Sequence, residues 1–183
     1  MYKAAYLLVF IMVLSSCKSP EARRPVQRSS GSFIQESAER NIEIYKKEEA
    51  VIAQVIAENP ETDFESSSNG FWYFYNTKDT LQTKTPRKGD IVTFTYDIKD
   101  LDGATIVSEE ENGLQQYQVD QSNQELISGI RDGIKLMKEG ETITFLFPSY
   151  KAFGYYGIEE KLPTNTPILS TVTLRSIETT EEN

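Results

Sequence analysis

Histidine is absent from this chain of 183 residues, and cysteine occurs only once. Without histidine the chain lacks the commonest general base and the commonest metal ligand of proteins. A single cysteine permits neither an intrachain disulfide nor a cysteine metal cluster. These absences argue against ordinary hydrolase and zinc chemistry, and we expect neither a bound metal nor a cofactor.

Positive charge is also scarce. The chain has 19 Lys and Arg residues against 28 Asp and Glu residues, which gives a formal net charge of −9. Nucleic-acid binding and polybasic membrane attachment both need clustered Lys and Arg, so we expect no nucleic-acid partner and no anchor of that kind. Aromatic residues are better represented, with ten Tyr and nine Phe. An apolar pocket lined by aromatic rings is therefore compatible with the composition.

The apolar run near the N-terminus, Ala4 to Leu14, is too short to span a bilayer comfortably. With Lys3 before it and small residues after it, this run predicts a secretory signal peptide over residues 1–16. The sequence LSSC that ends at Cys17 resembles a bacterial lipobox, which implies that Cys17 is acylated and becomes the new N-terminus. The alternative is an ordinary signal peptide followed by a buried cysteine.

An acylated Cys17 would fix the location of the protein. Acyl chains contribute about 0.8 kcal/mol per buried CH₂, so two or three of them hold a domain firmly at a membrane. We therefore expect a lipid-anchored protein of the cell envelope that faces the periplasm, on either the inner or the outer membrane.

A polar segment, residues 17–31, contains prolines and serines and is typical of a flexible tether. Residues 32–59 then have apolar side chains at helical spacing, up to the Asn-Pro pair that ends the pattern. The apolar stripe comprises Ile34, Ala38, Ile42, Tyr45, Ile52, Val55 and Ile56, and it is interrupted at Glu49. Such an amphipathic helix covers either its own domain or a second copy of the chain. The pattern leaves both alternatives open, including a homodimer through residues 32–58.

Strand patterns dominate the segment 70–178, after which a short tail, residues 179–183, ends the chain. Aromatic enrichment at 71–77 and alternation at 91–99 are typical of strands, as is the β-branched run 168–178. No helices alternate with these strands. The order favours an α+β fold in which a half-wound antiparallel sheet wraps around one short helix, preceded by the long amphipathic helix.

The short helix is expected within Leu126 to Met137, where apolar residues recur at helical spacing. Two glycines, Gly129 and Gly133, lie inside it, and each costs about 1 kcal/mol relative to Ala. Glycine in a helix usually marks a close approach of another group to the backbone. We expect side chains of the sheet to lie against these two residues.

Four blocks of the sequence carry a family resemblance. They are PRKGDIVTFTYDIKDLDGATIV, LISGIRDGIKLMKEGETITFLFP, SYKAFGYYG and LPTNTPILSTVTL. In this order and spacing they resemble the FK506-binding-protein (FKBP) family of peptidyl-prolyl isomerases, over a domain at 70–178. The stretches KSPEARRPV, GSFIQESAERN and NGFWYFYN resemble a narrower group, the gliding motility-associated peptidyl-prolyl isomerase lipoproteins. The resemblance implies an FKBP-like fold that acts on Xaa-Pro segments of exported client proteins, with the gliding machinery among its clients.

The resemblance also implies a shallow apolar pocket for the proline ring. The positions that match its catalytic residues are Tyr96, Tyr117, Ile127 and Phe153. The positions that match its substrate-binding residues are Ile106, Val107, Leu126, Ile130, Ile168 and Ser170. In this family the backbone at the positions of Leu126 and Ile127 binds substrate.

Several of these positions depart from the family's pattern. Ile106 and Val107 stand where the family has a phenylalanine-aspartate pair, and Ile130 stands where it has a tryptophan floor. Ser170 replaces a phenylalanine of the last strand, and Phe153 lacks the hydroxyl of the loop tyrosine. The pocket is therefore expected to be apolar, less aromatic than usual and without its usual carboxylate.

Such a pocket suits rotation about a prolyl bond, which needs neither a proton transfer nor a nucleophile. The barrier, about 18–20 kcal/mol, reflects lost amide resonance. The twisted amide has less charge separation than the planar one, so a dry apolar cleft favours it. We expect a membrane-anchored prolyl isomerase that assists the folding of exported proteins. The alternative is a catalytically weak or inactive module of the same fold that acts as a chaperone or scaffold.

Overall fold

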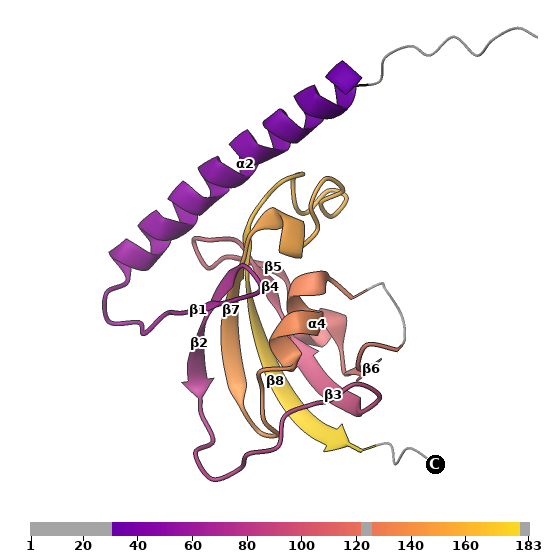
Figure 1. Cartoon of the computed structure of the whole chain (residues 1–183). Helices are drawn as coiled ribbons and strands as arrows, with labels where there is room; N and C mark the ends of the chain where they lie inside the picture. Colours follow the sequence, from indigo (N-terminus) through magenta and orange to yellow (C-terminus); the bar gives the residue numbers. More distant parts are fainter. Residues whose placement is uncertain (1–30, 122–125, 180–183) are drawn as a thin grey trace, which may run out of the picture. The chain divides into compact units, whose positions relative to one another are not determined.

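The computed structural model describes residues 31–121 and 126–179 (Figure 1). Cys17, the expected signal peptide and residues 17–30 of the expected tether lie outside the described residues. The chain divides into a unit of residues 1–37 and a unit of residues 38–183. In the first unit the structure describes only the start of helix α2 (Gly31–Glu58), and everything below concerns the second unit. Among the described residues no helix is both long and apolar enough to cross a membrane.

A single antiparallel sheet organises the second unit. Its strands are β1 (Glu65–Ser67), β2 (Phe71–Thr77), β3 (Ile91–Tyr96), β4 (Ile98–Lys99), β5 (Thr105–Val107), β6 (Gln115–Gln118), β7 (Thr142–Phe147) and β8 (Ile168–Glu178). They pair in the order β1-β2-β7-β8-β3-β6, and β4 pairs with both β5 and β8. The helices are the end of α2, α3 (Glu109–Asn112), α4 (Ser128–Ile134) and a 3₁₀ turn, η1 (Ser149–Lys151). The predicted α+β arrangement is confirmed, with helix α2 one residue displaced at each end from the expected 32–59.

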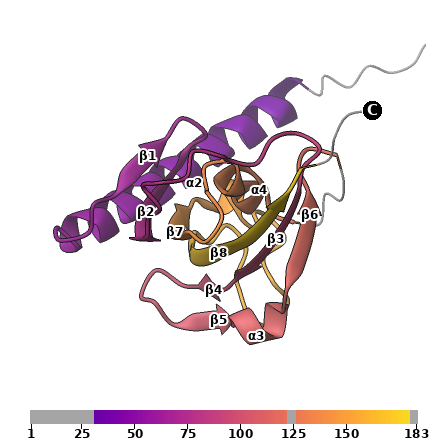
Figure 2. The ribbon, with the colours of Figure 1, turned by 90° about the horizontal axis from the view of Figure 1, so that it is seen from below.

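The sheet curves around α4, as Figures 1 and 2 show from two directions. Strands β7, β8 and β3 supply the inner face, because alternate residues of a strand point to the same side. The buried core that they share with α4 comprises Val92, Phe94, Ile130, Ile134, Met137, Ile143, Phe145, Phe147, Ile168, Val172 and Leu174. Helix α4 is therefore enclosed by the concave face of the sheet.

The two glycines of α4 face aromatic rings of β7. A Cβ on Gly129 would lie 2.6 Å from the ring of Phe147, and one on Gly133 would lie 2.8 Å from the ring of Phe145. The two rings stack with centroids 5.3 Å apart. Each fully buried Phe contributes about 1.5–3 kcal/mol, which offsets the helical cost of each glycine. The expected close approach to both glycines is confirmed.

Helix α2 packs on its own domain through part of its expected stripe. Ile52 is fully buried, whereas Ile42 is 52% exposed. The polar interruption of the stripe was expected at Glu49, but Glu49 is exposed and Glu48 is the buried residue. Ile44, Glu48 and Ile52 follow one another at steps of four residues and are half-buried or buried, so the packed face of the helix runs through Glu48 rather than Glu49.

Candidate functional site

Tyr96 ends strand β3 at the rim of the core, with its ring half-buried. Its ring centroid lies 5.9 Å from that of Phe94, and its carbonyl oxygen accepts a hydrogen bond of 2.9 Å from Nδ2 of Asn112. Burial raises the pKa of Tyr96 above its ordinary value because desolvation disfavours the phenolate. The phenol therefore stays neutral at physiological pH and remains a hydrogen-bond donor.

The entry to helix α4 carries Leu126 and Ile127, both half-buried against the core. Ile127 is the N-cap residue, with an extended backbone (φ −56°, ψ 144°), and its carbonyl accepts from the amide of Arg131 at 3.2 Å. Among the residues that the structure describes, no hydrogen-bond acceptor is found for the Ile127 amide N–H. An unpaired donor beside apolar side chains can bind a carbonyl oxygen of a peptide.

Phe153 belongs to the loop between β7 and β8 and is half-buried against the same core. The loop turns sharply around it, because the Ser149 carbonyl accepts hydrogen bonds from the amides of Ala152 (2.9 Å) and Gly154 (2.8 Å). Gly154 has φ +52°, a left-handed conformation that glycine adopts without strain. The loop is thus a closed turn that holds the ring of Phe153 toward the core.

Ile106 lies in β5 and is also half-buried against the core. Five predicted site residues are therefore each half-buried against the same core, with part of each side chain accessible. They are Tyr96, Ile106, Leu126, Ile127 and Phe153. This group can line an apolar pocket, and we refer to it as the rim group.

The other five predicted site residues lie deeper. Val107 and Tyr117 are buried members of the core, and Ile130, Ile168 and Ser170 have no exposed surface. The Tyr117 hydroxyl accepts a hydrogen bond of 3.0 Å from the amide of Asp120. These residues form the support beneath the rim group rather than its accessible surface.

Ser170 replaces an expected aromatic ring with a hydrogen bond. Its hydroxyl donates to the Asp97 carbonyl oxygen at 2.7 Å, and the Asp97 carboxylate accepts from the Thr171 amide at 2.8 Å. The same carboxylate forms an ion pair of 2.6 Å with Lys99. These bonds fix the chain directly after Tyr96, so the small polar residue at 170 positions the backbone instead of filling the pocket.

Sequence reasoning missed Asn112 as a support of Tyr96. Glu109 to Glu111 lie in helix α3, whose N-cap Ser108 accepts from the Glu111 amide. Helix α3 places Asn112 against the Tyr96 carbonyl. The sequence signal was the Ser-Glu-Glu-Glu start, which is typical of a helix N-terminus.

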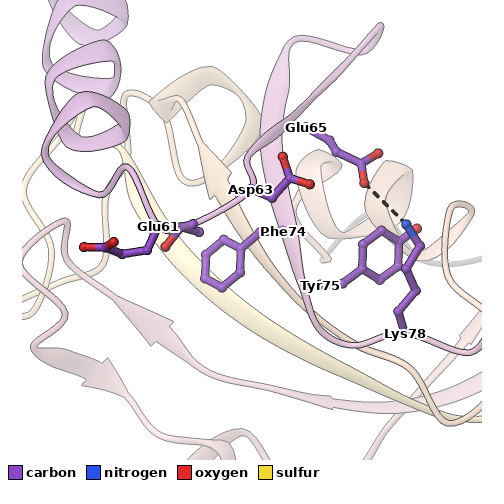
Figure 3. A pocket seen from close by; sticks show the side chains of 7 residues that line it. Glu61, Asp63, Glu65, Phe74, Tyr75 and Lys78 are labelled. Atoms are coloured by element: carbon purple, nitrogen blue, oxygen red, sulfur yellow. Dashed lines mark ion pairs between the residues drawn. The ribbon is translucent and has the colours of Figure 1, made fainter.

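In the described part of the chain, no group of three or more acidic or cysteine side chains is arranged to hold a metal ion. A separate polar cavity of about 460 Å³ lies beside β2, and Figure 3 shows its lining residues. They are Glu61, Thr62, Asp63, Glu65, Phe74, Tyr75 and Lys78. The Lys78 ammonium lies 3.5 Å from the Glu65 carboxylate and 4.1 Å from the centroid of the Tyr75 ring. None of the predicted site residues lines this cavity.

Comparison with known proteins finds relatives of one kind. Residues 82–175 match the family model described as FKBP-type peptidyl-prolyl cis-trans isomerase. A probable FKBP-type peptidyl-prolyl cis-trans isomerase FkpA from Neisseria meningitidis serogroup B is 34% identical over 94 residues. That match covers 51% of this chain and 34% of the relative, so the chain matches about a third of the relative's length.

Two solved structures share the fold. A peptidyl-prolyl cis-trans isomerase from Pseudomonas syringae pv. tomato is 20% identical with a TM-score of 0.58, and the match covers 74% of this chain and 94% of that one. FkpA from Escherichia coli is 17% identical with a TM-score of 0.54, and the match covers 96% of this chain and 82% of that one. At these identities the likeness concerns the fold alone. The family match, by contrast, spans half of this sequence, and the chain belongs to the FKBP-type peptidyl-prolyl cis-trans isomerase family.

Proposed function

We propose that this chain catalyses cis-trans isomerisation of Xaa-Pro bonds in exported polypeptides while anchored to a membrane through acylated Cys17. The observation that carries the catalytic part is the rim group, five half-buried apolar or aromatic side chains at one core, together with an Ile127 amide that has no acceptor among the described residues. No histidine exists in the chain to act as a general base. The chemistry proposed for this site requires none.

The rim group acts by replacing water. A planar prolyl amide is more dipolar than the twisted amide at the top of the barrier, so water stabilises the planar form more strongly. The Tyr96 side chain excludes water from the bond that rotates, which lowers the relative free energy of the twisted amide, whereas Phe153 forms a wall against the proline ring. The Ile127 amide and the Tyr96 phenol, both hydrogen-bond donors, hold the flanking carbonyl groups and restrict the peptide to a productive orientation.

Exchange spectroscopy by NMR on an Ala-Pro peptide tests the activity without a coupling enzyme. The chain is expected to accelerate cis-trans exchange at catalytic concentration, and the Tyr96→Ala variant is expected to lose most of that acceleration. An exchange rate equal to that of the peptide alone would contradict the proposed activity.

The second candidate is a chaperone or scaffold with the same fold and little catalysis. Two observations favour it: Ile130 and Ser170, at positions where the family has large aromatic rings, are fully buried, and Tyr155 and Tyr156 extend into solvent from the site loop. A chaperone of this kind would suppress aggregation of an unfolded client without changing prolyl exchange. This candidate would be favoured if the wild type and Tyr96→Ala both suppress aggregation of the client and neither of them accelerates cis-trans exchange of the peptide.

The anchoring proposal rests on the lipobox-like LSSC sequence and on the unique Cys17. Growth with a radiolabelled or alkyne fatty acid is expected to label the protein and to leave Cys17→Ser unlabelled. Membrane fractionation should then find the wild-type chain with one of the two envelope membranes. Unlabelled wild-type protein would contradict the proposal.

A role in gliding motility is proposed on the resemblance of the N-terminal stretches alone. Deletion of the gene in a gliding host is expected to reduce colony spreading, with rescue by the wild-type gene and not by the Tyr96→Ala form. Full spreading of the deletion strain would remove this part of the proposal.

Pairing of two copies through residues 32–58 is the proposed use of the part of α2 that does not pack on its own domain. Ile42 and Val51 are both exposed on this helix. Sedimentation is expected to find a dimer that Ile42→Glu converts to a monomer. A monomeric wild-type chain would leave α2 as a support of its own domain.

A further inference from the structure

Glu48 is a buried carboxylate whose partner lies 101 residues along the chain. Its side chain is only 6% exposed, yet no part of the proposed chemistry uses it. One carboxylate oxygen accepts from the Ser149 backbone amide at 2.8 Å, and the other accepts from the Ser149 hydroxyl at 2.6 Å. Ser149 itself is 1% exposed. Glutamate is seldom buried unless it is fully hydrogen-bonded, and both oxygens of Glu48 meet that requirement.

Ser149 links this carboxylate to the site loop. Its amide and hydroxyl point to Glu48, and its carbonyl accepts from the amides of Ala152 and Gly154. Phe153 is the residue between those two amides. The Ser149 N–H and hydroxyl, bound by Glu48, and the Ser149 carbonyl, which holds the loop at Phe153, belong to one residue, so Glu48 constrains the residue that holds this loop.

The same turn also contacts helix α4. The Lys151 carbonyl oxygen accepts from the Ser128 hydroxyl at 3.3 Å, and the Lys151 ammonium forms an ion pair of 2.9 Å with Asp132. A Cβ on Gly129 would lie 2.9 Å from the Lys151 carbonyl oxygen, so glycine permits this contact. The turn η1 is therefore held from two sides, by α4 and by α2.

Aromatic contacts support the α2 side of the turn. The rings of Tyr45 and Tyr150 meet edge to face with centroids 4.9 Å apart, and the Tyr150 hydroxyl donates to the Gly70 carbonyl oxygen at 3.0 Å. These contacts keep α2 beside η1, but none of them reaches the backbone of the loop at Phe153. The two hydrogen bonds from Ser149 to Glu48 join α2 to the residue whose carbonyl holds the loop at Phe153.

We propose that Glu48 is a positioning residue for prolyl isomerisation: through Ser149 it holds Phe153 in the place where the ring contacts the proline of the substrate. The inference rests on the proposed isomerase function. It makes helix α2, which lies outside the residues that match the family model, a part of the machinery of the site. Loss of the carboxylate would let the Ser149 amide and hydroxyl turn toward water and move Phe153 away from the proline.

The kinetic test compares three variants of the full chain. An apolar wall contacts the proline ring in both the ground state and the transition state, so its displacement raises KM more than it lowers kcat. We expect Glu48→Ala to raise KM for an Ala-Pro peptide about fivefold or more, with kcat within about twofold of the wild type. Glu48→Gln is expected to recover most of the loss, because its oxygen accepts from the Ser149 amide and its NH₂ donates to the Ser149 hydroxyl. Glu49→Ala, one position along the same helix and exposed, should leave both constants unchanged.

Hydrogen exchange separates positioning from general instability. In Glu48→Ala the amides of Ala152 and Gly154 are expected to exchange about tenfold faster or more, while the amide of Val172 in the core keeps its wild-type rate. An unchanged KM in folded Glu48→Ala would overturn the proposal, and so would equal acceleration of all three amides. If Glu48→Ala does not fold, Ser149→Ala removes only the hydroxyl bond, and an unchanged KM in that variant overturns the proposal equally.

The same experiment distinguishes the two proposals from each other. If the wild-type chain leaves prolyl exchange unaffected, the isomerase function is contradicted. The positioning role of Glu48 is then tested by the affinity for the peptide, measured by NMR titration. A Kd about fivefold weaker in Glu48→Ala would support positioning of a binding pocket without catalysis. Equal Kd values, or the absence of peptide binding by the wild type, would overturn the positioning role.

Discussion

Gly133 of helix α4 lies against Phe145 of strand β7 so closely that a Cβ would be 2.8 Å from two atoms of the ring. The contact explains why a short helix contains glycine at this point, since the sheet could not close around a larger residue. It also fixes the depth at which α4 lies, and with it the position of Ile127 at the start of the helix.

Gly133→Ala is therefore expected to destabilise the protein by about 1 kcal/mol, because overpacking costs about 2 kcal/mol and the gain in helix propensity returns about 1 kcal/mol. Urea unfolding measures the change. Adding Phe145→Leu should recover part of the loss by removing the atoms that clash, whereas Phe145→Leu alone should destabilise. A Gly133→Ala variant as stable as the wild type would show that the ring moves aside freely.

Gly129→Ala is expected to be less easily rescued. A Cβ there would meet both the Phe147 ring at 2.6 Å and the Lys151 carbonyl oxygen at 2.9 Å. A smaller residue at position 147 relieves only the clash with the ring, because the clash with the Lys151 carbonyl involves a backbone atom that no substitution removes. We expect Gly129→Ala to destabilise by about 1–3 kcal/mol and to raise KM, with Phe147→Leu restoring neither fully. Complete rescue would contradict the role of the Lys151 carbonyl.

Glu141 is a second buried carboxylate whose role is structural. It accepts from the Asp79 amide at 3.0 Å and from the Lys138 amide at 2.8 Å, which joins the segment after β2 to the turn before β7. Glu141→Ala leaves both donors without this partner and is expected to cost about 2–5 kcal/mol. The exposed Glu178→Ala serves as the control, with a change below about 0.5 kcal/mol in the same urea titration. Similar effects of the two substitutions would contradict the assignment.

Stability should fall at alkaline pH through Tyr73. Burial and the hydrogen bond to Glu65 raise the pKa of Tyr73 from 10.0 to about 12 in the folded state. The contribution of Tyr73 to the free energy of unfolding is fully present below the unfolded pKa of about 10 and is lost as the pH rises toward 12. In that window only the unfolded chain releases the proton of the Tyr73 hydroxyl. Urea unfolding from about pH 8 to about pH 11 is expected to give a smaller decline for Tyr73→Phe than for the wild type. Equal declines would contradict the raised pKa.

Phe153→Tyr is expected to strengthen binding of an Ala-Pro peptide. The residue lies at the position where the family has a loop tyrosine whose hydroxyl binds ligand, and one hydrogen bond contributes about 0.5–1.5 kcal/mol, or roughly twofold to tenfold in Kd. Calorimetric titration measures the change, and Tyr155→Phe on the same loop is the control. If Phe153→Tyr binds no more tightly than the wild type, the side chain of residue 153 does not contact the peptide.

The sequence predicted the fold well because its signals were local. Alternating strands, the glycines of α4 and the helical spacing of 32–59 all depend on residues close together in the chain, and the structure confirms each. The apolar stripe of α2 was expected to be interrupted at Glu49, and the burial of Glu48 was not foreseen, because the partner that makes a buried carboxylate tolerable lies 101 residues away at Ser149. Patterns of spacing contain no information about such a pair.

The candidate site was predictable only as a set of positions. Family resemblance selected ten residues, but it did not separate the accessible rim group from the fully buried Ile130, Ile168 and Ser170, because burial depends on packing between segments far apart in the sequence. The bond from Ser170 to the Asp97 carbonyl joins residues 73 positions apart and has no local signal. The acylation of Cys17 and the link to gliding remain predictions.

The central claim is that a dry apolar rim, without an acid or a base, suffices to speed prolyl rotation. The direct measurement is kcat/KM for an Ala-Pro peptide by exchange NMR from about pH 6 to about pH 9, where neither histidine nor the neutral Tyr96 phenol introduces a titration. We expect a profile that is flat within about twofold for the wild type, and a loss of about tenfold or more in Tyr96→Ala at every pH. A bell-shaped profile, or wild-type exchange no faster than that of the free peptide, would contradict the account.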